Sequence, residues 1–159
     1  MKFVQVYFND QYIEVTSWND GGVYIFNYDF QPIVLDKIIK NEDLGRAIKI
    51  ALESSHNIAP DLVKEILFSP LVKQKKQDRQ NELMKKFNYR SKKSFFKNMR
   101  NISIELQDNY NISPSHQDGL DYSFSGLSKA DEIVLSGDTT DEELGQTVRL
   151  AYEKCTSIY

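Results

Sequence analysis

Two stretches of the chain, residues 33–55 and 133–155, resemble each other at an offset of 100 positions. Both contain Ile-Val-Leu at the start and Leu-Gly near the middle, followed by matching alanine and glutamate residues. Further upstream, the alternating apolar residues of 4–12 align with those of 102–110 after a slip of two positions. Self-similarity of this kind usually reports a structural duplication, so we expect two copies of one unit related by a pseudo-two-fold axis.

Each copy is expected to form strands followed by one helix. Residues 4–8 alternate apolar and polar side chains, as a half-buried strand requires, and short strands are predicted at 12–16, 23–26 and 33–35. In the second copy the corresponding strands are 102–106, 110–112, 122–124 and 133–135, with Pro114 stopping the second of them or placing it at an edge.

The helix of each copy is predicted from apolar spacing i, i+4, i+7, i+8, i+11, which marks one helical face. It begins near Leu44 in the first copy and near Leu144 in the second. Asn41 is the expected N-cap of the first helix, and Thr140 with Glu143 is the expected capping box of the second. The glycine after each leucine costs ~1 kcal/mol relative to alanine, so we expect close packing there.

The predicted fold class is therefore α+β, with antiparallel or mixed sheets in an internally duplicated chain. We expect a single domain over residues 1–159, made of a first unit (1–57), a helical insert (58–90) and a second unit (91–159). Two helices are expected in the insert, the second from about Pro70 to Phe87. Its middle, residues 73–82, has no apolar residue, so it must be solvated or must face a partner.

Charge is distributed very unevenly. Residues 73–100 hold eleven Lys and Arg residues against two acids, a net charge of +9, whereas the whole chain has −3. The remainder therefore carries −12, which describes an acidic surface with one basic stripe and informs about partners more than about fold.

Sequence motifs for cofactors and metals are missing. The two histidines stand in no zinc-binding pattern, and no glycine-rich phosphate loop occurs, so we expect neither a metal site nor a cofactor. The one cysteine, Cys155, falls on the apolar face of the second helix and is expected to be a buried small hydrophobe. No apolar run approaches the ~20 residues that a membrane span needs, so the expected location is the cytoplasm, without membrane contact.

An enzymatic and a nucleic-acid interpretation stand as alternatives. His116 with Asp118 could serve as a general base and its orienter, but no nucleophile or second carboxylate is fixed nearby, so no catalytic residue is predicted. The basic segment 73–100, with aromatic residues interleaved, could bind nucleic acid as a regulator. The acidic remainder of the chain would repel phosphates, and direct nucleic-acid binding is not expected.

The second half carries an ordered set of motifs. They are Tyr89-x-x-Lys92, Phe95-Phe96-Lys97-x-Met99, Ser103-Ile104-Glu105, Ile112-Ser113-Pro114-Ser115-His116, Gly126, Leu135 and Glu143-Leu144-Gly145. This set is similar to the immunity proteins of bacterial contact-dependent growth inhibition systems, the CdiI type, in a branch long catalogued as a domain of unknown function. The resemblance covers most of 89–155 and, through the repeat, the first helix.

The resemblance implies a function without catalysis. Such a protein binds the C-terminal toxin domain of a cognate effector, in many systems a nuclease and often one acting on tRNA, and blocks it. An acidic protein suits this role, since carboxylates can mimic the phosphates of a nuclease substrate. We expect a monomer that forms a one-to-one toxin complex. The predicted toxin-binding residues are loop carboxylates and aromatic anchors: Trp18, Asp20, Asp29, Asp118, Asp121, Tyr122 and Asp131.

Overall fold

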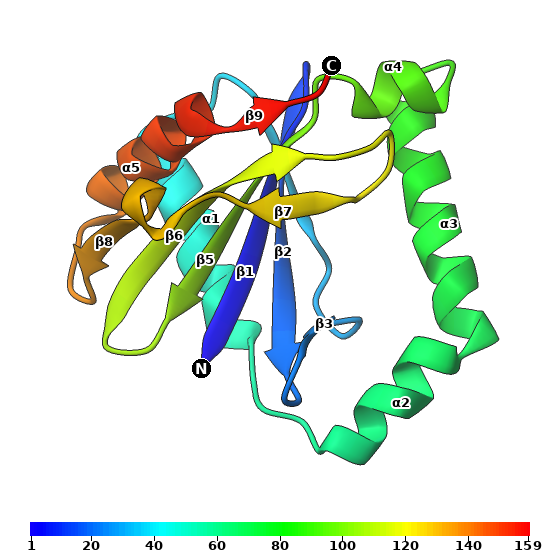
Figure 1. The fold of residues 1–159 in the computed structure, drawn as a ribbon, viewed down its shortest axis with the longest axis horizontal. Coiled ribbons are helices and arrows are strands. Elements are labelled where there is room, and N and C mark those ends of the chain that lie inside the picture. Colours follow the sequence, from blue (N-terminus) through cyan, green and yellow to red (C-terminus); the bar gives the residue numbers. More distant parts are fainter.

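The computed structural model describes residues 1–159 as one nine-stranded sheet with helices around it (Figure 1). The elements follow in the order β1 (Lys2–Phe8), β2 (Tyr12–Asp20), β3 (Tyr24–Phe26), β4 (Ile33–Asp36), α1 (Asn41–Ser54), α2 (Pro60–Phe68), α3 (Pro70–Lys86), α4 (Lys92–Phe96), β5 (Arg100–Leu106), β6 (Asn109–Gln117), β7 (Phe124–Gly126), the 3-10 turn η1 (Lys129–Asp131), β8 (Ile133–Ser136), α5 (Asp141–Lys154) and β9 (Thr156–Ser157).

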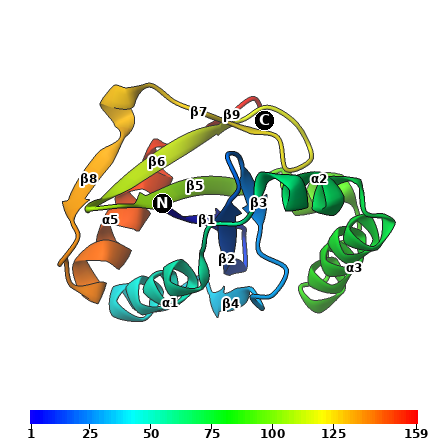
Figure 2. The same ribbon diagram turned by 90° about the horizontal axis from the view of Figure 1, so that it is seen from below.

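The sheet runs β3-β2-β1-β5-β6-β7, with β4 beside β2 and with β8 and β9 beside β6. All of these strand pairs are antiparallel except β6 with β9. The predicted α+β class with an antiparallel or mixed sheet is therefore confirmed. The sheet curls, with α1 and α5 against one face between β8 and β4, and with α3 over the opposite face (Figure 2).

The main core lies between the sheet and the pair α1 and α5. Alternation along the central strands sends Val4, Val6, Ile102 and Ile104 to this face, and all four are fully buried. The remainder of the core comes from the apolar faces of the two helices and from Ile13, Val15, Tyr110 and Ile112. No helix of the structure is both long enough and apolar enough to cross a membrane.

The two long helices touch each other at their glycines. A Cβ placed on Gly45 would lie 1.9 Å from the backbone oxygen of Asp141, and one on Gly145 would lie 1.9 Å from that of Asn41. Only a residue without a side chain permits this approach, which explains why the first turn of each helix tolerates the conformational cost of glycine. The close packing expected from the sequence is present.

Equivalent residues of the repeat make reciprocal contacts. Lys49 donates to the carbonyl of Thr139 at 2.8 Å and pairs with Asp141 at 2.8 Å. Arg149, which stands 100 positions later, donates to the carbonyl of Ile39 and to Oδ1 of Asn41. The two halves also share the element order of four strands and a helix. Their origin by duplication stays a prediction.

One local expectation is wrong, and of another only one alternative holds. Asn41 is the first helical residue and Lys40 precedes it as the N-cap without a side-chain bond, because the Asn41 amide oxygen is engaged by Arg149 of α5. Pro114 does not stop its strand: β6 continues to Gln117. Pro114 lies between the β6 residues that pair with β8 and those that pair with β7, an edge-like position where proline is tolerated.

Thr140 is the N-cap of α5, and its hydroxyl accepts from the backbone N–H of Glu143 at 3.1 Å. The reciprocal half of the expected capping box is absent, because the Glu143 carboxylate accepts from the Thr139 hydroxyl instead. The predicted cap is thus confirmed in one of its two bonds.

The insert forms an arm that stands off the sheet and touches it at its two ends. Val63 of α2 is buried against Gly21, and Leu83 near the end of α3 is buried in a second apolar cluster. That cluster also holds Phe95, Phe96 and Met99, together with Tyr7 and Tyr12 of the first unit. The apolar residues that open the second unit therefore pack against the strands of the first.

We predict that Gly45→Ala destabilises the chain by about 2–4 kcal/mol, because the new methyl group must push α5 away from α1. Helix propensity alone would give a gain of up to ~1 kcal/mol, so the sign separates the two effects. Urea unfolding measures the change. Gly126→Ala is the control, since its Cβ meets nothing within 4 Å. Equal stability of the two variants would contradict the packing argument.

Candidate functional site

The face of the sheet under α3 is polar, whereas the face under α1 and α5 is apolar. Gln5, Thr16, Asn101 and Ser103 occupy the strand positions that alternate with the core residues. Strand register aligns Thr16, Gln5 and Ser103 in one row across three strands. Glu14, Tyr7 and Asn101 form the next row. A sheet face lined with amides and hydroxyls offers hydrogen bonds to another chain and gives little hydrophobic stabilisation of its own.

Hydrogen bonds hold these side chains in place. Gln5 Oε1 accepts from the Tyr7 hydroxyl at 2.8 Å and from Asn101 Nδ2 at 2.9 Å. Trp18 Nε1 donates to the Thr16 hydroxyl at 2.9 Å, and that hydroxyl donates to the Gln5 carbonyl. The floor is therefore fixed before any partner arrives, which lowers the entropy that binding must overcome.

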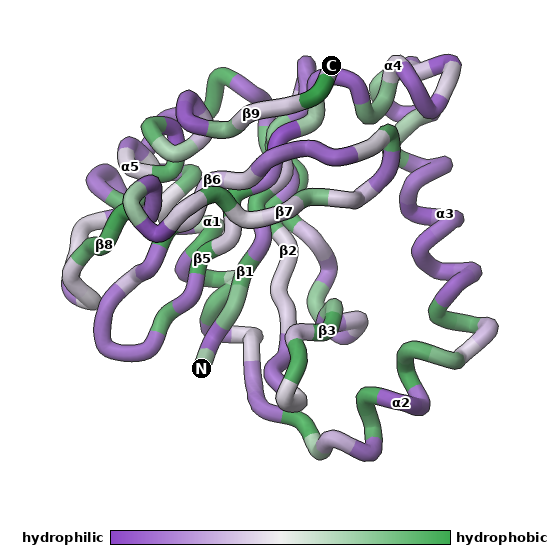
Figure 3. Tube along the Cα trace, in the orientation of Figure 1, coloured by the Kyte–Doolittle hydropathy of each residue, from purple (hydrophilic) through white to green (hydrophobic).

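Helix α3 faces this floor across a cleft of about 670 Å³. Figure 3 shows the helix as the most hydrophilic long element of the molecule. The stretch 73–82, which contains no apolar residue, supplies the wall of the cleft. The prediction that it is solvated or faces a partner fits this position, because the helix does not rest on the sheet there.

One buried ion pair joins the wall to the floor. Arg79 of α3 contacts Oε2 of Glu14 at 2.5 Å, and Glu14 is only 5% exposed. Burial raises the pKa of Glu14, and the attraction of Arg79 offsets part of this rise. The pair fixes the position of α3 more than it adds stability, because desolvation opposes the Coulomb attraction.

Several cationic groups of the wall have no partner. Lys73, Lys75 and Lys76 line the cleft, and none of them takes part in an ion pair. Arg79 uses its terminal nitrogen for Glu14, while its buried Nε has no hydrogen-bond partner in the chain. The wall therefore presents these cationic donors together with the carboxylates of Asp78 and Glu82, which line the same cleft.

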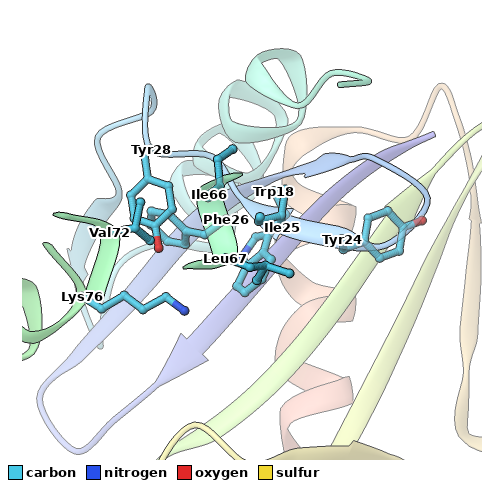
Figure 4. Close-up of a pocket in the computed structure, with 9 residues that line it drawn as sticks. All are labelled: Trp18, Tyr24, Ile25, Phe26, Tyr28, Ile66, Leu67, Val72 and Lys76. Atoms are coloured by element: carbon cyan, nitrogen blue, oxygen red, sulfur yellow. The ribbon is translucent and has the colours of Figure 1, made fainter. Parts of the chain in front are cut away.

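A small aromatic pocket of about 70 Å³ lies where α2 and α3 approach β2 and β3. Figure 4 shows Phe26 and Tyr28 close to Ile66 and Val72, with Lys76 extended below Tyr28. The Tyr28 hydroxyl is buried without a partner. This pocket shares four residues with the cleft, so the two hollows are neighbours: Trp18, Phe26, Tyr28 and Lys76.

The structure brings only two of the seven predicted binding residues into the cleft. Trp18 lines it from β2, and Tyr122 lines it from the loop between β6 and β7. The Tyr122 ring stands edge-on to Tyr7 at 5.5 Å and to Phe96 at 5.0 Å. Both aromatic anchors are thus placed at the cleft.

The five predicted carboxylates are dispersed. Asp118 and Asp121 lie in the β6–β7 loop beside Tyr122. Asp20 ends β2 and accepts from the N–H of Gly22 at 3.0 Å. Asp29 lies in the turn after β3, and Asp131 lies in η1, where it accepts from Ser128. Asp118 and Asp121 share a loop with Tyr122 of the cleft, and Asp29 lies between Tyr28 and Phe30, which also line it.

Sequence reasoning does not identify the floor of the cleft. Gln5, Thr16 and Ser103 occupy positions of half-buried strands whose side chains are expected to face solvent. The sequence does contain a signal for this floor: polar residues alternate along the central strands, and the predicted helix of the insert has a stretch without apolar residues. His116 contacts Thr156 at 2.7 Å and Asp118 at 3.7 Å, and it does not line the cleft. No cluster of three or more potential metal ligands is present.

Cys155 is half-buried beside the main core, and burial raises the pKa of its thiol. A raised pKa keeps the sulfur protonated and unreactive near neutral pH. This agrees with the expected role of a small packed side chain.

Comparisons with known proteins give one consistent result. The model of the family described as "CdiI: CDI immunity protein" matches residues 2–155. The chain is 29% identical over 131 residues to the immunity protein CdiI-YPIII of Yersinia pseudotuberculosis, covering 74% of each chain.

Two solved structures share the fold. A protein of unknown function from Neisseria meningitidis superposes with a TM-score of 0.87 at 25% identity, covering 97% of this chain and 94% of that one. A toxin and immunity complex, CdiA-CT/CdiI, from Yersinia pseudotuberculosis gives 0.83 at 22% identity, covering 97% of each chain.

The raised pKa of Glu14 predicts how its stability contribution depends on pH. Above the ordinary glutamate value of 4.5, the folded chain retains a proton that the unfolded chain has released. Stability contributed by Glu14 therefore falls as pH rises through that window. We expect the free energy of unfolding of the wild type, relative to Glu14→Gln, to decrease from about pH 4.5 to pH 7.

Urea unfolding of both proteins across that range measures the slope. Glu82→Gln, an exposed change on the same helix as Arg79, should follow the wild type. An opposite slope for the wild type relative to Glu14→Gln would mean that the attraction of Arg79 outweighs burial.

Proposed function

Because the chain belongs to the family of CDI immunity proteins, we propose that it binds and neutralises the C-terminal toxin domain of one cognate contact-dependent growth inhibition effector. The observation that carries the proposal is the family match, which spans both halves of the sheet and the arm between them. The Yersinia pseudotuberculosis structure is a complex of a toxin with its immunity protein, so that protein has the same kind of partner. The toxin is expected to lose its activity because it is covered, without turnover by the immunity protein.

We propose further that the toxin is a nuclease, with tRNA as its foremost candidate substrate. Support comes from charge: outside 73–100 the chain carries a net −12. A nuclease needs a basic surface to hold phosphates, and an acidic inhibitor is attracted to that surface over long range and competes with the substrate. Binding in the cytoplasm as a one-to-one complex completes the proposal, since a tRNA-cleaving domain acts there.

The proposed contact residues are the seven selected from the sequence, and they differ in the support they have. Trp18 and Tyr122 have the strongest, since both line the cleft and aromatic side chains dominate interface energies. Asp118 and Asp121 stand next to Tyr122 on one loop, suited to meet a basic surface. Asp29 lies between two residues that line the cleft, Tyr28 and Phe30, whereas Asp20 at the end of β2 and Asp131 in η1 would contact the toxin only in a larger footprint.

The experiment is co-purification followed by an activity assay. The tagged chain is produced in its native cell, and a toxin domain encoded directly upstream should be recovered with it in a one-to-one ratio. Equimolar chain should then abolish RNA cleavage by that domain. A toxin that stays fully active at equimolar chain contradicts the proposal, whereas recovery of nucleic acid alone would favour the regulator using residues 73–100.

We predict that Asp118→Asn/Asp121→Asn slows association with the toxin about three- to tenfold and leaves dissociation nearly unchanged, because exposed charges at a rim act on the on-rate. The local turn should survive, since the amide that replaces the Asp121 carboxylate keeps an oxygen able to accept from the N–H of Ser123, a bond of 2.9 Å in the wild type. Stopped-flow binding at two salt concentrations measures both rates.

The control is Asp108→Asn/Asp138→Asn, which removes the same charge from exposed turns beside β6 and α5. Its association rate should stay within about twofold of the wild type. Equal slowing by both double variants would show that only net charge matters, which contradicts a contact at the β6–β7 loop.

A further inference from the structure

The basic stripe, residues 73–100, divides into two parts in the structure. Lys73, Lys75 and Lys76 of its first part line the cleft, together with both acids of the stripe, Asp78 and Glu82. The second part, residues 85–97, contains no acid, and none of its residues lines the cleft. It comprises the end of α3, the turn after it and α4, at the end of the arm (Figure 1). Its basic residues form the cationic corner: Lys85, Lys86, Arg90, Lys92, Lys93 and Lys97.

The side chains of the cationic corner have no acidic partners within the chain. All six are exposed, and none takes part in an ion pair. The other four arginines of the chain all donate hydrogen bonds to carboxylates, amide oxygens or carbonyls: Arg46, Arg79, Arg100 and Arg149. Arg90 makes no such bond, so its guanidinium is free to bind a planar group of oxygens outside the chain.

The backbone of the cationic corner is fixed from beneath. Phe95 and Phe96 of α4 are fully buried in the second apolar cluster. Two amides of the β1–β2 hairpin hold the corner from the other side. Asn9 Nδ2 donates to the carbonyl of Phe95 at 2.8 Å, and Gln11 Nε2 donates to the carbonyl of Phe87 at 2.8 Å. The cations therefore project from a rigid frame, and a partner loses little affinity to ordering of that backbone.

The aromatic residues that interleave with these cations do not form a surface. Phe95 and Phe96 are buried, while Phe87 and Tyr89 are half-buried against the same apolar cluster. Residues 85–97 expose no large hydrophobic side chain. Stacking on unpaired bases needs exposed aromatic rings, and binding in a membrane interface needs exposed apolar side chains. The corner offers charge alone, which suits a repeated array of phosphates.

We propose that the cationic corner binds the phosphate backbone of double-stranded nucleic acid without reading its sequence. Lys and Arg side chains that neutralise phosphates release condensed counterions, and this release supplies sequence-independent affinity. The inference goes beyond the proposed function and concerns a surface outside the cleft. Where the toxin is a nuclease, as proposed above, this contact holds the immunity protein close to the substrate of the toxin.

The acidic remainder of the chain does not neutralise this corner. The acidic first turn of α5 lies on the opposite side of the molecule (Figure 1), and charges more than ~8 Å apart are largely screened at physiological salt. Three acids border the corner. Asp10 lies in the β1–β2 turn, and Asp118 and Asp121 lie in the loop whose Tyr122 packs against Phe96. The six cations outnumber them.

Salt dependence provides the first test. The purified chain, without toxin, is titrated into a fluorescent DNA duplex and into fluorescent tRNA, and anisotropy gives the affinity between about 50 and 200 mM KCl. The logarithm of the affinity should fall with the logarithm of the salt concentration with a slope of roughly −3 to −5, since each phosphate contact contributes about −0.9. Two duplexes of different sequence should bind within about threefold of each other.

Binding of either probe with this slope supports the inference, and the comparison of the two probes shows whether DNA or structured RNA is preferred. Absence of binding to both probes at the lower salt concentration would overturn it. A preference of more than about tenfold for one duplex sequence would do the same, because phosphate contacts carry no sequence information.

Neutralising part of the corner provides the second test. Lys92→Gln/Lys93→Gln should lower the affinity for the bound probe about tenfold at low salt and make the slope shallower by about 2. The control, Lys129→Gln/Lys154→Gln, removes the same charge from exposed positions in η1 and at the end of α5. It should change the affinity by less than about threefold and leave the slope unchanged.

Equal effects of the two double variants would overturn the inference, because net charge alone would then account for binding. Sedimentation with phosphatidylglycerol vesicles tests the other source of phosphate. Binding to these vesicles without binding to either nucleic acid would assign the corner to a lipid surface and overturn the inference.

The two proposals fail independently, because these titrations contain no toxin. A chain that binds neither probe and still neutralises the toxin refutes only the role of the cationic corner. A chain that binds the probes and leaves the toxin fully active refutes the proposed function and leaves the inference standing.

Discussion

The contact between α1 and α5 at Gly45 and Gly145 determines how the rest of the molecule is arranged. Backbone meets backbone there, so the two helices lie together on one face of the sheet and bury the apolar residues of its central strands. No second pair of amphipathic helices is left for the face under α3. That face is polar in its central strands and is crossed only by a helix without an apolar stripe. The cleft is thus a consequence of placing both amphipathic helices of the repeat on one side.

The ion pair of Glu14 and Arg79 fixes the position of the arm but adds little to the free energy of folding. The two residues are 65 positions apart, and burial of the carboxylate opposes the attraction between them. Such a pair gives a defined geometry, because a displaced α3 would leave Glu14 buried and unpaired. Anchors at Val63 and Leu83 hold the ends of the arm, and the ion pair sets its middle. The wall lysines are thereby presented at a fixed distance from the floor.

Sequence patterns predict the parts that depend on local periodicity. The repeat locates both long helices, alternation locates the strands, and the glycine after each leucine indicates close packing. What cannot be predicted depends on contacts between distant residues. Nothing local places Arg79 over Glu14, and Asn41 is not the cap that its residue type suggests because its partner, Arg149, lies 108 positions away. Pro114 is tolerated inside its strand because the change of partner from β8 to β7 is a property of the whole sheet.

The residues of the candidate site also divide into those that the sequence predicts and those that depend on contacts between distant residues. Trp18 and Tyr122 can be selected as aromatic anchors from residue type alone, and both line the cleft. Gln5, Thr16 and Ser103 cannot be selected in this way, because a polar residue at alternate strand positions ordinarily faces water. Only the position of α3 makes that face of the sheet the floor of a cleft. The carboxylates selected for charge are scattered, since residue type says nothing about which loops converge.

A polar, preformed cleft favours selectivity over affinity. Any group that fills the cleft strips water from the lysines of the wall and from the amides of the floor, and this cost is offset only where the group replaces the lost hydrogen bonds. An apolar groove would impose no such condition on what enters it. The fold creates this cleft by leaving one face of its sheet polar and holding a charged helix above it.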